Sequence, residues 1–293
     1  MFAIPAALDT SESTLKNIAN IMILPSIVQM LRSTIFIYCA LLAVFFLKKR
    51  LYKHHWTSMS IIITGVLIVG IAYFIDKDDS NKTYSPTDQI IGLIILQIGQ
   101  ILGAFAYIAE EKFIGDSEDL DPLQIVGYEG IAGIIIWITL LPILNVIPCS
   151  AKSLCNQENS VIESSLGAFR DYAANPILIG QSIFLCLDVT ILNVAGVSTT
   201  KYGSAAQRTT CDMLRNIVVW VVLMNVAVEF ADGKPKYDTF SWIQLAGFIV
   251  LVFGILMYNE LIVLPIWGLN KNTKIAIEER TKYSQEERKS ISY

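Results

Sequence analysis

Apolar runs of about 20 residues recur along this chain, separated by short loops that hold most of the charged residues. A run of this length lets an α-helix cross a lipid bilayer with all of its backbone hydrogen bonds made internally. Hydrophobic residues make up 54% of the chain and charged residues only 16%, whereas a soluble domain has about 25% charged residues. The sequence therefore predicts an all-α membrane protein.

Eight membrane-spanning helices are predicted. They fall at residues 2–20, 25–47, 56–75, 88–111, 122–147, 174–197, 204–228 and 239–264. The first is the least apolar, because Asp9, Glu12 and Lys16 interrupt it, and taken alone it would be read as an interfacial helix. Its position directly before a repeated pair of helices favours a true span.

This repeated pair occurs near the start of the chain and again near its end. Both copies share Met-Leu-Arg followed by Trp, Gly and Tyr, at Met30, Leu31, Arg32, Trp56, Gly70 and Tyr73, and at Met213, Leu214, Arg215, Trp242, Gly254 and Tyr258. Duplicated helical halves are typical of transporters, which alternate access around a central site. The repeat indicates a carrier.

The two halves are unequal in length. We expect residues 1–76 to be three helices of a first repeat, 77–265 to be five helices of a second, and 266–293 to be a disordered cytosolic tail. Relative to a ten-helix parent, the first two helices would then be lacking. That difference leaves a second function open, a membrane scaffold or interaction protein derived from a truncated carrier that does not transport.

The distribution of basic residues predicts the orientation. Twelve Lys and Arg residues fall on the side of both termini and six on the opposite side, which places both termini in the cytosol by the positive-inside rule. The longest loop on the other side holds Cys149 and Cys155, for which a disulfide and two free thiols both remain open. Asn81 begins a glycosylation sequon on that side.

Charged side chains within spans are costly to insert, so we expect them to face a polar cavity or one another. Arg32, Arg208 and Arg215 are candidates for binding an anionic substrate group, because guanidinium makes bidentate contacts with carboxylate or phosphate. Gln29 and Gln97 are candidates for lining the same cavity.

Three aspartates in the predicted spans are candidates for counter-charge or proton coupling. They are Asp9, Asp188 and Asp212. Structural pairing is the alternative, since Asp212 lies four residues from Arg208 and three from Arg215 on one helical face. For Asp9 and Asp188, the alternative partner is Lys16 or an arginine.

Two further clusters of polar residues are predicted to be solvated. One is the charged run Glu110-Glu111-Lys112 at a helix end, and the other is the pair His54-His55 in a basic loop, where the sequence offers no third metal ligand.

Phosphate-binding loops, Gly-x-Ser-x-Gly and Cys-x-x-Cys are absent from the sequence. We therefore expect no enzymatic activity, no cofactor and no metal. The expected partners are a small-molecule substrate and the lipid bilayer, not nucleic acid, and a homodimer remains open.

Several short motifs carry a resemblance to a known family. They are Ser26–Arg32, Glu110-Glu111-Lys112-Phe113, Val126–Gly130, Asn193–Ser198, Val219-Trp220 and Tyr258-Asn259. In their order they resemble the EamA-like carriers of the drug/metabolite transporter superfamily, and most closely the F subfamily of solute carrier family 35. The resemblance implies a ten-helix inverted-repeat fold and alternating-access transport of a small polar or anionic metabolite. It also implies an endomembrane location, lysosome-like or Golgi, with mitochondria as an alternative. For the run Glu110-Glu111-Lys112, the resemblance implies a gate or fold-anchoring role as the alternative to a solvated one.

Overall fold

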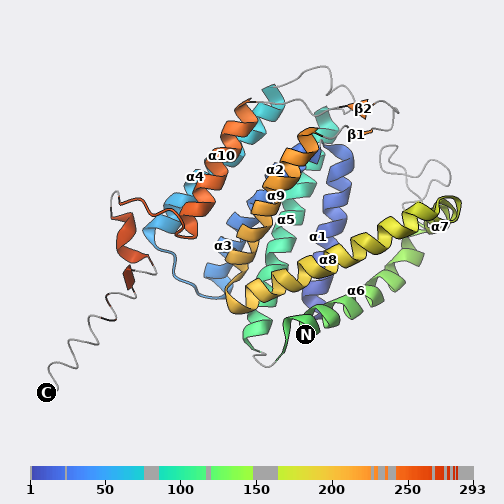
Figure 1. Ribbon diagram of the computed structural model, residues 1–293, viewed down its shortest axis with the longest axis horizontal. Coiled ribbons are helices and arrows are strands. Elements are labelled where there is room, and N and C mark those ends of the chain that lie inside the picture. Colours follow the sequence, from blue (N-terminus) through green and yellow to red (C-terminus); the bar gives the residue numbers. More distant parts are fainter. Residues whose placement is uncertain are drawn as a thin grey trace. The chain divides into compact units, whose positions relative to one another are not determined.

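The computed structural model describes residues 2–23, 25–75, 86–116, 120–147, 164–225, 228–229, 235–236, 242–265 and 268–273, with positions 276–277, 280 and 282. The helices are α1 (Ala3–Met22), α2 (Pro25–Leu31), η1 (Arg32–Thr34), α3 (Ile35–Phe46), α4 (Lys53–Ile75), α5 (Pro86–Gly115), α6 (Pro122–Leu144), α7 (Ser165–Ala174), α8 (Pro176–Tyr202), α9 (Ala205–Asn225), α10 (Trp242–Tyr258) and η3 (Leu269–Asn272). Within these ranges, the strands are the short antiparallel pair β1 (Val228–Glu229) and β2 (Pro235–Lys236). The predicted all-α fold is confirmed (Figure 1).

Each predicted span coincides with a helix or, for 25–47, with the run α2–η1–α3. Five stretches are long and apolar enough to cross a membrane: Ile27–Phe46, Lys53–Ile71, Gln89–Gly115, Pro122–Leu144 and Pro176–Tyr202. The apolar part of α10, Leu245–Tyr258, is shorter. Helices α1 and α9 have 20 and 21 residues, but each carries three ionisable side chains. The short exposed helix α7 was not predicted.

Local capping explains where the helices around the site begin. Asp121 and Gln124 form a capping box at the start of α6, and Pro122 occupies its first turn. The Asn175 side chain accepts a hydrogen bond from the Ile177 N–H at the start of α8. These caps satisfy N–H groups that a helix cannot satisfy internally.

The second predicted span is not a single α-helix. At Arg32–Thr34 it tightens into the 3₁₀ turn η1, where the Thr34 hydroxyl donates to the Leu31 carbonyl at 2.9 Å. A 3₁₀ turn inside a helix is often found at a functional hinge. This turn contains Arg32, the residue that the repeat pairs with Arg215.

The chain packs as two compact units. The first unit comprises Met1–Val28 and Tyr84–Asp212, and the second comprises Gln29–Thr83 and Met213–Tyr293. Each unit contains residues from both predicted repeats. The repeats are defined by sequence similarity and the units by packing, so the two divisions need not coincide. The repeat boundaries at 1–76 and 77–265 therefore stay a prediction.

In the first unit, α1 lies against α5, and α6 contacts both α1 and α8 (Figure 1). Glycines on one face of α5 allow the close approach of α1. A Cβ at Gly92 would meet Met22 and Ile23, and one at Gly103 would meet the Glu12 carboxyl group. Small residues at a helix contact are a common way to pack helices in membranes.

In the second unit, α4 and α10 lie side by side (Figure 1). A Cβ at Gly247 would meet Ile68, and a Cβ at Gly254, seven residues on, would meet Ile61, seven residues back. The two helices therefore run antiparallel in a fixed register. This register brings the start of α4 to the end of α10.

Candidate functional site

A cavity of about 400 Å³ lies within the first unit. Its volume is in the range of small-molecule sites, which start at about 300 Å³. Five helices, α1, α5, α6, α8 and α9, contribute its lining. The polar lining residues are Asp9, Thr10, Tyr107, Glu110, Glu129, Thr190, Asn193 and Arg208.

A buried ion pair forms one wall of this cavity. Arg208 Nη1 donates to Glu110 Oε1 and Oε2 at 2.7 and 2.6 Å. Arg208 is 8% exposed and Glu110 is 3% exposed, so water screens this pair only weakly. The two residues are mutually dependent, because either one alone would be a buried unpaired charge.

The start of α9 fixes the position of Arg208. The Ala205 N–H donates to Glu111 Oε2 at 3.2 Å, and the Gln207 N–H donates to the Ser204 hydroxyl at 3.3 Å. These contacts cap α9 against the end of α5, and Arg208 lies in the first turn after them. Space for the guanidinium comes from Gly196 on α8, where a Cβ would lie 2.7 Å from Arg208 Nε.

Tyr107 extends the network beyond the ion pair. Its ring lies 4.3 Å from Arg208 Cζ, a cation–π contact. Its hydroxyl donates to Asp212 Oδ2 at 3.2 Å. Glu110, Arg208, Tyr107 and Asp212 are therefore linked in one chain of contacts.

Carboxylates outnumber basic groups around the cavity. Asp9, Glu110 and Glu129 line it together with a single guanidinium, that of Arg208. Glu129 Oε1 is buried and has no hydrogen-bond partner among the described residues. A buried carboxylate oxygen without a donor is unusual in a folded protein. The cavity thus has an unmet capacity to bind a proton, a hydrogen-bond donor or a cation.

The sequence-based candidates divide between the two units. Arg208 and Asp9 line the cavity, and Asp212 contacts its wall through Tyr107. Gln97 and Asp188 belong to the same unit but are outside the lining set, and Asp188 is exposed on α8. The remaining candidates, Gln29, Arg32 and Arg215, belong to the second unit, where Arg32 Nη1 donates to Gln29 Oε1 at 3.3 Å.

Two expectations about solvation were wrong. Glu110 is buried, because Arg208 of α9 packs against it, whereas Lys112 of the same charged run is exposed as predicted. Helix α5 also continues beyond the predicted end at residue 111, to Gly115. Phe113 and Ile114, which follow the charges, were the available signal that the helix continues. His54 is also buried, at 3% exposed, because α4 begins at Lys53 and α10 covers its first turn.

Two other predicted sites lie outside the described residues. They are the disulfide between Cys149 and Cys155 and the glycosylation sequon at Asn81. The free cysteines that the structure describes are Cys39, Cys186 and Cys211.

Comparison with known proteins gives matches along most of the chain. A family model described as nucleotide-sugar transporter matches residues 2–127. Solute carrier family 35 member F6 of Rattus norvegicus is 32% identical over 261 residues, covering 89% of this chain and 66% of that protein. The Homo sapiens protein of the same name is 32% identical, with coverages of 89% and 67%.

A more distant relative is an uncharacterized protein of Schizosaccharomyces pombe, which is 28% identical over 264 residues, with coverages of 90% and 75%. The chain spans about two thirds of the length of the solute carrier relatives that it matches.

Proposed function

We infer that this chain carries a small polar metabolite across an intracellular membrane. The chain belongs to the F-subfamily-like group of solute carrier family 35, in the drug/metabolite transporter superfamily. The proposed mechanism is alternating access. The observation that carries the proposal is the cavity within the first unit, which five helices line with charged and polar side chains. Such side chains are expensive inside a membrane and are typical of a substrate or ion pathway.

The charges of the cavity favour one class of substrate. Three carboxylates and one guanidinium line it, and that guanidinium is already paired with Glu110. A multiply charged anion would meet a surplus of negative charge there. We therefore propose a neutral or cationic polar substrate, or an anion that enters together with protons.

Glu129 is the proposed proton-binding group. Its buried Oε1 lacks a donor among the described residues, so protonation or a substrate N–H would satisfy it. Asp9 lines the same cavity from α1 and provides a second carboxylate. Asn193 and Thr190 on α8 supply neutral hydrogen-bonding groups for a substrate that carries hydroxyl or amide groups.

Uptake into proteoliposomes tests the proposal. The purified chain would be reconstituted and offered a radiolabelled panel of nucleotide sugars, neutral polar metabolites and cationic metabolites, with and without an imposed pH gradient. We expect saturable uptake of at least one compound and stimulation by the gradient. Glu129→Gln keeps the size of the side chain and should abolish the stimulation by removing the titratable group.

The matched control is Asp171→Asn, which also neutralises an acid but lies exposed on α7, away from the cavity. It should behave as the wild type. Absence of uptake for every compound, from a folded and correctly inserted protein, would contradict the carrier and favour the non-transporting scaffold. Gradient-stimulated uptake that persists in Glu129→Gln would remove Glu129 from the proton pathway.

A further inference from the structure

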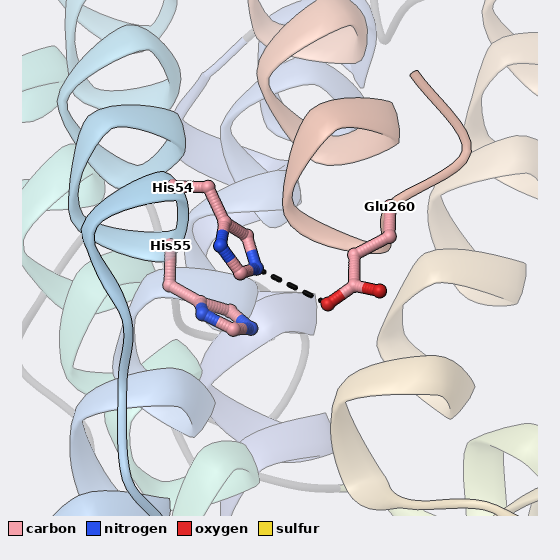
Figure 2. A group of neighbouring side chains, drawn as sticks. All are labelled: His54, His55 and Glu260. Carbon is pink, nitrogen blue, oxygen red and sulfur yellow. Dashed lines mark ion pairs between the residues drawn. The ribbon is translucent and has the colours of Figure 1, made fainter. Parts of the chain in front are cut away.

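Both histidines of the chain lie beside a glutamate in the second unit, as Figure 2 shows. His54 and His55 occupy the first turn of α4, and Glu260 follows the end of α10. One ligand-capable atom from each of the three residues lies within 4.8 Å of the others. His54 Nε2 and Glu260 Oε1 are 3.2 Å apart.

The register of α4 and α10 explains this meeting of residues distant in sequence. Gly254 faces Ile61. Six residues further along the chain from Gly254 lies Glu260, and six residues back from Ile61 lies His55. Glu260 also has a positive φ of 59°, a left-handed conformation that is uncommon for residues other than glycine and is often found at functional positions.

His54 has unused binding capacity. It is 3% exposed, and neither of its ring nitrogens makes a hydrogen bond of acceptable geometry to the described residues, despite the short Nε2–Oε1 distance to Glu260. Buried polar groups almost always have a partner, and neutral imidazole nitrogens are the commonest metal ligands in proteins.

His55 is held in place by its surroundings. The Tyr52 N–H donates to His55 Nδ1 at 3.1 Å, and the Tyr258 ring meets the His55 ring edge-on with centroids 4.6 Å apart. The two histidine rings have centroids 3.9 Å apart.

We propose that His54, His55 and Glu260 bind a divalent transition metal of the Zn²⁺ class and so join the start of α4 to the end of α10. Two ligand atoms on one tetrahedral Zn²⁺ are about 3.3 Å apart, since Zn–N and Zn–O bonds are about 2.0–2.2 Å. The 3.2 Å between His54 Nε2 and Glu260 Oε1 already matches this spacing. Water would fill the fourth position.

The local charges select the class of ion. Lys48, Lys49, Arg50 and Lys53 precede the histidines, so a hard cation held by charge alone would be repelled. The positive end of the α4 helix dipole also lies beside the negative end of the α10 helix dipole, so the electric fields of the two helices largely cancel at the site. Coordinate bonds to imidazole nitrogen must then supply the affinity, which favours Zn²⁺, Co²⁺ or Ni²⁺ over Mg²⁺ and Ca²⁺.

Metal titration of the purified, chelator-stripped protein in detergent tests this site. We expect one Zn²⁺ per chain by elemental analysis. A Co²⁺ spectrum should show d–d bands without thiolate charge transfer, which separates this site from the five cysteines. Zn²⁺ should raise the melting temperature and Mg²⁺ should not, because only the ion that binds the folded state stabilises it.

Variants then assign the ligands. His54→Gln and Glu260→Gln keep approximate size, and each should raise the Zn²⁺ dissociation constant by more than about tenfold, since even groups behind the ligands contribute that much. Asp171→Asn, the matched neutralisation on α7, should bind as the wild type. Zn²⁺ should also protect wild-type histidines from diethyl pyrocarbonate, a readout that reports only on His54 and His55 and does not depend on a variant folding.

Failure to bind Zn²⁺, unchanged binding in both variants, or a Co²⁺ spectrum dominated by thiolate would overturn the proposal. Modification of the histidines at the same rate with and without Zn²⁺ would do the same. None of these measurements involves the cavity of the first unit, so the proposed transport function stands or falls separately.

Discussion

At the scale of single residues, two buried glutamates are each paired with a basic side chain. Glu12 and Lys16 form an ion pair at 2.8 Å within α1, and Glu110 and Arg208 form one between α5 and α9. Glu12 and Glu110 are 2% and 3% exposed. Each acid therefore depends on its base, since a single charge without a counter-charge would be unstable in such surroundings.

Removal of one member of the Glu110–Arg208 pair should destabilise the protein strongly. For Arg208→Met we expect a loss of about 3–5 kcal/mol, because the Glu110 carboxylate stays buried without its guanidinium. The double variant Arg208→Met with Glu110→Leu should recover most of this loss. Thermal unfolding in detergent of both single variants and the double variant measures the coupling.

The matched comparison is Arg170→Met, which removes an exposed arginine on α7 and should leave the melting temperature unchanged. A double variant that is as unstable as the sum of its two single variants would show that the two residues act independently.

At the scale of helices, glycine contacts set how closely neighbours approach. A Cβ at Gly65 on α4 would lie 2.7 Å from the Leu251 backbone N and 2.8 Å from the Gly247 backbone O on α10. Backbone atoms cannot move aside as a flexible side chain can. The α4–α10 contact, and with it the alignment of His54 and Glu260, therefore requires glycine at this position.

Gly65→Ala should separate α4 from α10. Overpacking of this kind costs about 1–3 kcal/mol. Gly70→Ala on the same helix is the control, because a Cβ there meets nothing within 4 Å. We expect Gly65→Ala to lower the melting temperature and Gly70→Ala not to lower it. Equal melting temperatures would show that the helices can move apart at no cost.

If the metal site depends on this contact, Gly65→Ala should also weaken Zn²⁺ binding while Gly70→Ala should not. This comparison links helix packing to the ligands without changing a ligand.

At the scale of the whole molecule, the chain is an integral membrane protein of the solute carrier type. Helices α6 and α8 expose large apolar side chains along their length, among them Ile138, Phe184 and Ile191, each at least 68% exposed. A hydrocarbon environment suits such surfaces, whereas water does not.

The orientation in the membrane is predicted from the loops. Tags placed before residue 1 and after residue 293 should both be digested by protease added to the cytosolic side of sealed vesicles, because Lys and Arg are concentrated on that side. A tag in the loop around residue 155 should be protected until detergent is added. Protection of either terminal tag would reverse the predicted orientation.

The sequence by itself determined the class of fold and the approximate extent of the helices. Hydropathy is a local property, and a membrane leaves the backbone almost no alternative to the helix, so apolar runs are enough to place the spans. The same reasoning marked Asp9 and Arg208 as functional candidates, because an ionisable residue in a span rarely lacks a role.

Only the tertiary structure decided which of these residues meet. Arg208 pairs with Glu110, which lies 98 positions earlier in the sequence. Glu260 lies beside His54 and His55 because α4 and α10 pack in an antiparallel register. Periodicity within a helix says which face a residue occupies, but not which helix covers that face. Glu110 was therefore predicted to be solvated at a helix end and His54 to be solvated in a loop, although packing by helices distant in sequence buries both of them.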